Sequence, residues 1–430
     1  MESEPRKKRS GFGRLLRILG PGLITGAADD DPSGIATYSQ TGAQFGYGQL
    51  WTAVFMLPLM IAVQEACARI GQVTGKGLAA VIKERYSRGV VLGAVMLVLV
   101  ANTINIGADI GAMAAATRLV IPINLVLLTL CFTAVILFLE IFTSYRVYAR
   151  ILKWLALALA AYVVTALMVA EPWPTLLRAT FVPHLEFNFA FLFIITGVVG
   201  TTISPYMFFW EASEEVEEER ERHVRKPEGR PALSWSDVRR MRTDNAIGMI
   251  VSNIVTWCII VTAATVLWSH GVTDIATAAD AAKALEPLVR TFPHAGYLAK
   301  AIFSVGVIGL GLLAVPVLSG SASYAVAEAF NWKEGLNRKF RRAHGFYGVI
   351  TVATVIGLAI NFIGIDPMKA LVVAAVINGV VAVPLIALVA RIANDRSVMG
   401  EFKSGWLSNV FVWLTFVGMA AAAIGMFAAR

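Results

Sequence analysis

The chain has 430 residues, of which 57% are hydrophobic and only 15% charged, and its mean hydropathy is +0.68. Soluble domains average about 45–50% apolar and about 25% charged residues, so this composition excludes a soluble protein and indicates a polytopic membrane protein. The net charge of +8 does not indicate nucleic-acid binding, because most of the 37 Lys and Arg residues fall in alternate loops, as the positive-inside rule requires. We expect a multi-pass protein of the plasma membrane with the lipid bilayer as partner, a cytoplasmic N-terminus and an extracellular C-terminus.

Eleven apolar segments are long enough to cross a bilayer as helices. They cover residues 17–46, 50–70, 89–117, 122–143, 151–170, 187–211, 245–269, 297–327, 345–362, 368–390 and 405–428. The prediction is an all-α chain that forms a single transmembrane domain over 1–430. Cys67, Cys131 and Cys258 lie apart in these segments and indicate packing rather than a disulfide or a metal site.

The first segment contains the stretch Ala28-Asp29-Asp30-Asp31-Pro32-Ser33-Gly34. An ionised side chain costs at least about 2.5–3.5 kcal/mol at the bilayer centre, so three adjacent acids need a function. Pro32 and Gly34 both weaken a helix interior, and we expect the helix to break beside the acids. Broken backbone at membrane depth is tolerated only where it lines a protein cavity. The stretch therefore predicts a cation site in the middle of a membrane transporter.

Polar residues also recur at helical spacing in the next two segments. Glu65 and Arg69 are four residues apart and can pair, either as a structural ion pair or as part of a gate. Asn102, Asn105 and Asp109 form one polar stripe. Such a stripe either joins helices or lines a watery path, and the sequence leaves both interpretations open.

The sixth segment contains a second predicted break, Gly197–Tyr206, with hydroxyls at Thr201, Thr202 and Ser204 before Pro205. The hydroxyls could instead bond the carbonyls of their own helix around the proline. The acidic run 211–219 follows, and we expect a solvated helical extension, or alternatively an acidic funnel that concentrates cations.

Two broken segments, the first and the sixth, each open a block of five. An odd offset inverts the second block relative to the first, and paired broken helices in two halves indicate a transporter site at the membrane midplane. The prediction is a 5+5 inverted repeat, with 17–170 as the first repeat, 187–390 as the second and 405–428 as an extra helix.

In this order and on these segments, the motifs resemble the Nramp family of divalent-metal transporters, which have the fold of the leucine transporter. Gly20-Pro21-Gly22 fits the opening of the family, and Asp31-Pro32-Ser33-Gly34 stands where the family has Asp-Pro-Gly-Asn. Gly200-Thr201-Thr202-Ile203-Ser204-Pro205-Tyr206 stands where it has Gly-Ala-Thr-Val-Met-Pro-His. Further matches are Gln64, Arg69, Gly71 and Thr74-Gly75-Lys76 in the second segment and Asp109 in the third.

The resemblance implies the metal-site residues Asp31, Gly34, Thr201 and Ser204, to which we add the hydroxyl of Ser33. Glycine replaces the family's asparagine ligand, and Ser204 replaces a methionine whose thioether favours transition metals. A hard, oxygen-only site suits Mg²⁺, which is usually bound with some of its waters retained. The chain is most similar to the branch of Nramp-related magnesium transporters, which implies uptake of partly hydrated Mg²⁺ by alternating access.

Proton coupling is not expected, because the two histidines of the family's sixth helix are replaced by Tyr206 and Glu211. The acid that follows the third-helix aspartate is replaced by Ala112. The alternatives are a proton-coupled Mn²⁺/Fe²⁺ carrier, a channel-like Mg²⁺ pathway and an amino-acid carrier of the same fold. No His-Glu-x-x-His or Gly-x-Ser-x-Gly motif is present, so we expect no enzyme activity, no cofactor besides the transported ion, and a monomer.

Overall fold

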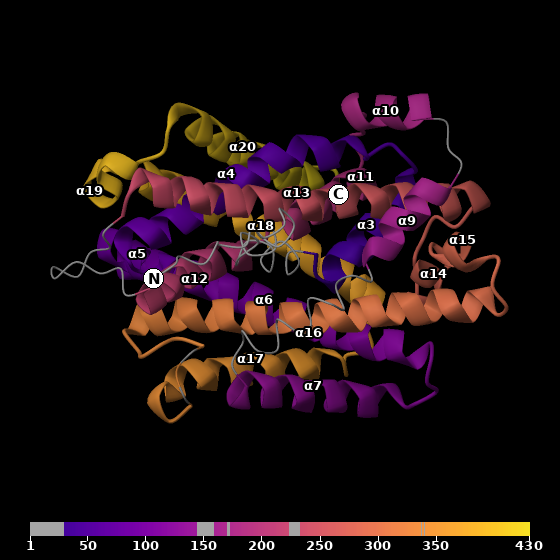
Figure 1. Cartoon of the computed structure of the whole chain (residues 1–430), viewed down its shortest axis with the longest axis horizontal. Helices are drawn as coiled ribbons and strands as arrows, with labels where there is room; N and C mark the ends of the chain where they lie inside the picture. The colour runs from indigo at the N-terminus through magenta and orange to yellow at the C-terminus, as the bar shows by residue number, and fades with distance from the viewer. Residues whose placement is uncertain (1–29, 144–158, 170–172, 223–232, 337, 339) are drawn as a thin grey trace, which may run out of the picture.

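The structure, a computed structural model, describes residues 30–143, 159–169, 173–222, 233–336, 338 and 340–430 (Figure 1). These residues form helices and loops without any β-strand among them. Eight helical segments in this part of the chain are long and apolar enough to cross a membrane, and α17 (His344–Ile360) is a shorter apolar helix. The all-α, multi-spanning prediction is therefore confirmed, although the predicted first and fifth segments lie partly outside the described residues.

The long spans are α4 (Trp51–Thr74), α6 (Arg88–Arg118), α7 (Leu125–Phe142), α11 (Phe189–Thr202) continued by α12 (Pro205–Arg222), α13 (Trp235–Val266), α16 (Ala295–Phe330), α18 (Pro367–Asn394) and α20 (Trp406–Ala428). The shorter elements are α3 (Pro32–Phe45), α5 (Leu78–Arg85), α9 (Ala160–Met168), α10 (Trp173–Phe181), η2 (Trp268–His270), α14 (Ala278–Lys283), α15 (Glu286–Val289), η3 (Phe340–Arg342), α19 (Arg396–Met399) and η4 (Gly400–Phe402). In Figure 1 the long helices run along the longest axis, with α5 and α19 at one end and α10, α14 and α15 at the other.

The outer surface of the bundle is apolar. In α7 and in α20, only 28% of an apolar stretch of 18 residues is buried inside the protein. Large side chains such as Phe138 and Ile424, which are 59% and 68% exposed, point away from the protein. Soluble monomers rarely show apolar patches of this extent, whereas lipid tails solvate them without cost. The polar residues, by contrast, are largely buried between the helices.

Glycines bring α11, the helix before the second break, into close backbone contact with α18. A β-carbon at Gly200 of α11 would lie 2.2 Å from the carbonyl oxygen of Ala375 in α18. A β-carbon at Gly379 of α18 would lie 2.4 Å from the carbonyl oxygen of Thr196 in α11. Both distances are far inside van der Waals contact, so only glycine fits. Small residues at helix contacts are what packing in lipid requires, and they fix α11 against α18 just before the second break.

The start of the seventh segment and the acidic run 211–219 both differ in detail from the prediction. The helix that carries the predicted seventh segment begins at Trp235, ten residues before 245, and Ser234 and Asp237 form a capping box at its start. The run 211–219 continues α12, as expected, but it is not a simple solvated extension. Glu211, Glu217 and Glu219 are only 5–8% exposed, and Glu217 accepts hydrogen bonds from the Tyr324 hydroxyl and the Leu336 amide. Glu217 is buried because α16 and the loop after it supply these two donors.

The glycine contacts predict a selective loss of stability in Gly379→Ala. The added methyl group meets a backbone carbonyl that cannot move alone, so we expect a loss of about 1–3 kcal/mol. The matched control is Gly93→Ala on α6, where a β-carbon has nothing within 4 Å and helix propensity improves by up to about 1 kcal/mol. The measurement is the apparent melting temperature in detergent. Equal melting temperatures for the two variants would contradict the packing.

Candidate functional site: two helix breaks at a buried carboxylate

Asp31 lies directly before α3 and caps its first turn. Its backbone is extended, with φ −68° and ψ 171°, and Pro32 occupies the first helical position, where the missing N–H costs nothing. Its Oδ1 accepts hydrogen bonds from the Gly34 amide at 2.8 Å and from the Ser33 hydroxyl at 2.5 Å. Helix α3 begins at residue 32, directly after the acids, whereas the part of the predicted break before residue 30, including Asp29, lies outside the described residues.

A third donor reaches Asp31 from another helix. Asn105 of α6 donates from Nδ2 to Asp31 Oδ2 at 2.8 Å. Asp31 is 1% exposed, and its carboxylate is bonded to three donors that are all uncharged. Hydrogen bonds to an ionised group are about twice as strong as neutral ones, but they do not neutralise the charge. The carboxylate is therefore oriented and still in need of a cation.

The second break lies opposite the first. Helix α11 ends at Thr202, residues 203 and 204 are not helical, and α12 begins at Pro205. The hydroxyl oxygens of Ser33 and Thr201 are 3.2 Å apart. A β-carbon at Gly34 would lie 3.4 Å from Thr201 Oγ1, so the glycine keeps the two breaks in contact without filling the space between them. The sequence thus correctly placed Asp31, Ser33, Gly34 and Thr201 close together.

Ser204 contacts this cluster through the backbone carbonyl of Thr201. Its hydroxyl donates to the carbonyl oxygens of Thr201 at 2.7 Å and Gly200 at 3.0 Å. Thr202 likewise donates to the carbonyl of Val198 at 2.7 Å. The back-bonding that the sequence left open is therefore present for both hydroxyls. Ser204 keeps its oxygen lone pairs, but it meets the Thr201 carbonyl rather than the Asp31 carboxylate in this structure.

The polar stripe on α6 makes contacts between helices, which is one of the two interpretations that the sequence left open. Asn102 donates to the carbonyl of Leu318 on α16 at 2.8 Å, which joins two helices. Asn105 orients Asp31, which belongs to the site. Asp109, one turn further along, is fully buried, and neither of its carboxylate oxygens has a hydrogen-bond partner among the described residues. The helical spacing with Asp109 singled out Asn105 in the sequence, but it did not predict the contact with Asp31.

Two further contacts were not predicted. Asp30, which the sequence suggested for a vestibule, is 2% exposed and accepts a hydrogen bond from Ser252 of α13 at 3.1 Å. The hydroxyls of Tyr38 and Thr202 lie 2.9 Å apart and join α3 to α11. Tyr38 follows Asp31 by seven residues, so helical periodicity alone places it on the same face of α3.

Negative charge is concentrated at this point. Asp30, Asp31 and Asp109 are at most 2% exposed, and the one basic side chain among the described buried residues, Arg69, is bonded elsewhere. Leaving a buried charge unpaired costs several kcal/mol, so the cluster attracts a cation or a proton. In the described part of the chain, no three His, Cys, Asp or Glu side chains converge as a ready-made metal cage. An ion here would be held mainly by one carboxylate and neutral oxygens.

A helix that begins at a buried acid and packs against a broken helix is typical of a membrane transporter. Chain comparisons agree with this class. Residues 22–429 match the family described as natural resistance-associated macrophage protein-like, Nramp. The chain therefore belongs to the Nramp family, whose members are transporters of divalent metal ions and not enzymes, and the ion is the substrate.

Relatives and solved structures are similar to the chain over most of its length, and the solved structures show the fold alone. The chain is 26% identical over 423 residues to the divalent metal cation transporter MntH of Ralstonia nicotianae, covering 95% of this chain and 90% of the relative. It is 28% identical over 401 residues to MntH of Klebsiella pneumoniae subsp. pneumoniae, covering 92% and 90%. The fold is similar to the Eremococcus coleocola manganese transporter, with a TM-score of 0.72, 19% identity and coverage of 98% and 88%. It is also similar to Mhp1, a nucleobase-cation-symport-1 transporter, with a TM-score of 0.60, 15% identity and coverage of 96% and 91%.

Asp31 both carries the negative charge and caps α3, and we predict that these two roles can be removed separately. Asparagine is as good a helix cap as aspartate, so Asp31→Asn should fold and keep the bond from the Gly34 amide. It removes the negative charge, and divalent-ion binding measured by calorimetry should fall below detection. Asp31→Ala should lose binding and also about 1 kcal/mol of stability with the cap. Retained binding in Asp31→Asn would show that this carboxylate is not a ligand.

Proposed function

We propose that this Nramp-family chain takes up hard divalent cations through an oxygen-only site, admitting Mg²⁺ alongside the Mn²⁺ named for its relatives. The observation that supports this most directly is the set of groups around Asp31. The carboxylate accepts hydrogen bonds from the Ser33 hydroxyl and the Gly34 amide, and the Ser33 hydroxyl lies 3.2 Å from that of Thr201, whose carbonyl is at the end of α11. Carboxylate, carbonyl and water ligands suit Mg²⁺, Ca²⁺ and Mn²⁺, whereas thioethers select softer metals.

The ligand roles are proposed residue by residue. Asp31 supplies the charge, and Ser33 and Thr201 supply neutral oxygens, because each hydroxyl can turn from donor to acceptor when a cation arrives. Ser204 acts through the Thr201 carbonyl or through a retained water. Mg²⁺ gives up its waters reluctantly, so a site with few protein ligands suits a partly hydrated ion. Alternating access follows from movement of the two broken helices relative to the other spans.

A second candidate is a carrier dedicated to Mn²⁺ and Fe²⁺ and coupled to protons. The names of the relatives, MntH and manganese transporter, favour Mn²⁺ as the cargo. Asp109 favours coupling, because a buried carboxyl without a partner is able to carry a proton. Against this candidate, the four described histidines, His184, His270, His294 and His344, lie in loops or at helix ends away from the two breaks.

We further propose that the chain works as a monomer with its N-terminus in the cytoplasm. The distribution of basic residues supports this orientation, which places the α5 and α19 end of the bundle at the inner surface. An inside-negative potential then favours entry of the ion. For a divalent cation the contribution is about 4.6 kcal/mol at 100 mV, twice the value for a single charge.

Ser204→Met tests the choice of ion. It places a thioether at the position where the family has methionine, so Cd²⁺ should compete about tenfold better against Mg²⁺ and Mn²⁺. Ser204→Leu is the control, because it removes the same hydroxyl and adds similar volume without sulfur. The measurement is competition in metal-uptake assays with proteoliposomes. A wild-type protein that carries Mn²⁺ and Cd²⁺ but not Mg²⁺ would overturn the oxygen-only interpretation.

Proton coupling is tested by following internal pH during uptake. We expect Mg²⁺ entry to speed up with inside-negative voltage while internal pH stays constant, both in the wild type and in Asp109→Asn. Voltage alone provides the driving force in this scheme. Acidification that accompanies uptake and disappears in Asp109→Asn would instead establish the proton-coupled candidate.

A further inference from the structure

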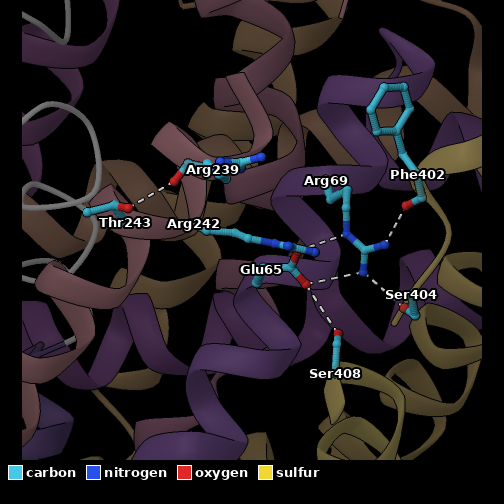
Figure 2. A network of polar contacts seen from close by, with 8 residues as sticks. All are labelled: Glu65, Arg69, Arg239, Arg242, Thr243, Phe402, Ser404 and Ser408. Carbon is cyan, nitrogen blue, oxygen red and sulfur yellow. Dashed lines mark hydrogen bonds and ion pairs between the residues drawn. The ribbon is translucent and has the colours of Figure 1, made fainter. Parts of the chain in front are cut away.

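Glu65 of α4, another buried acid, lies in a polar network of its own (Figure 2). Arg69 donates to it from Nε at 2.8 Å and from Nη2 at 3.2 Å, and Arg242 of α13 donates from Nε at 2.7 Å. The hydroxyl of Ser408, in α20, donates at 3.2 Å. Arg69 also binds the loop before α20 through the Phe402 carbonyl and the Ser404 hydroxyl. The network therefore ties α4, α13 and α20 together.

The network has a net charge of +1. It contains two guanidinium groups, of Arg69 and Arg242, and the single carboxylate of Glu65. Arg69 is fully buried and its bonds are directed inward. The side chain of Arg242 is 39% exposed and uses only Nε among the described residues. Its two Nη groups are therefore available donors, and the surplus charge sits at the surface.

A crevice opens at this point. Its volume is about 670 Å³, and it lies between α4, α13 and α20 with Glu65, Arg242 and Ser408 on its polar side. Its apolar side is formed by Pro58 and Ile61 of α4 and Phe411 of α20, among others. One side of the crevice is cationic and the other is apolar. A phosphate group with hydrocarbon chains attached matches both sides.

The first turn of α20 lines the same crevice. Gly405 precedes the helix and provides no side-chain cap, and the first amide of this helix with a backbone partner is that of Asn409. The amides of residues 406–408 have no acceptor among the described residues. Helix N-termini favour anions. Trp406 and Leu407 are 76% and 60% exposed, which is typical of side chains at the boundary between lipid and water.

We propose that this crevice binds one anionic phospholipid. Its phosphate meets the Nη groups of Arg242 and the free amides at the start of α20, and its acyl chains lie along α4 and Phe411. The surplus positive charge argues for an anionic headgroup rather than a zwitterionic one. Such a lipid seals the seam between a helix of the first predicted repeat, a helix of the second and the extra helix.

The first experiment uses the full chain in detergent and counts bound lipids by native mass spectrometry. Phosphatidylglycerol and phosphatidylcholine with identical acyl chains compete for the protein. We expect a wild-type preference of about tenfold for phosphatidylglycerol, the size of one charge-assisted hydrogen bond. Arg242→Gln should remove that preference. Arg240→Gln, which removes the same charge from the exposed face of α13 outside the crevice, should keep it.

A second variant guards against a folding defect in Arg242→Gln. Ala246→Phe fills the crevice and leaves every charge of the network in place, so it should also lose the bound phosphatidylglycerol. Inorganic phosphate alone distinguishes a plain anion site from a lipid site. Thermal stabilisation by phosphate equal to that by phosphatidylglycerol would overturn the lipid proposal. Equal binding of the two lipids by the wild type, or unchanged preference in both crevice variants, would do so as well.

Discussion

The structure depends on a carboxylate that is buried without a basic partner. Asp31 is bonded to the Gly34 amide, the Ser33 hydroxyl and the Asn105 amide, which orient it but carry no charge. Isolated buried charge is among the most costly features a fold can contain, and proteins keep it where a ligand will compensate it. The chain accepts this cost at the start of α3, where Asp31 caps the first turn and the hydroxyl of Ser33 lies 3.2 Å from that of Thr201, just before the break between α11 and α12.

Glu65 shows what the same chain does with a carboxylate that has a structural function. It lies on α4 and receives two guanidinium groups and a hydroxyl, so its charge is more than balanced. No exchangeable cation is needed there. Both acids lie in apolar segments, and composition alone does not tell them apart. The difference is the charge of their partners, and this is the physical basis for placing the cation site at Asp31 and a joint between helices at Glu65.

The sequence predicted the all-α spans and the break before Pro205, and it singled out residues that the structure brings together, because lipid makes such features conspicuous. A proline, a glycine and an acid within an apolar segment have few interpretations. It could not predict which side chain from another helix would reach Asp31, since the stripe on α6 offers Asn102, Asn105 and Asp109 at similar spacing. It was wrong about the 211–219 run, because burial there depends on α16 and the loop after it. Long-range packing of this kind leaves no periodic signal in the sequence.

The hydroxyls around Asp31 determine how the site can change from a hydrogen-bonded state to a metal-bound state. Ser33 now donates to Asp31, and rotation about one bond is enough to present its lone pairs to an ion instead. Asn105 cannot do this without turning its whole amide group, so it remains a donor to Oδ2, while Oδ1 loses the Ser33 donor and keeps the Gly34 amide. Oδ2 therefore stays bonded to Asn105, and Oδ1 gains a position for the ion. Under the proposed function, this asymmetry lets the site accept a cation by rotating a hydroxyl rather than by moving backbone, and it suits an ion that keeps part of its water shell.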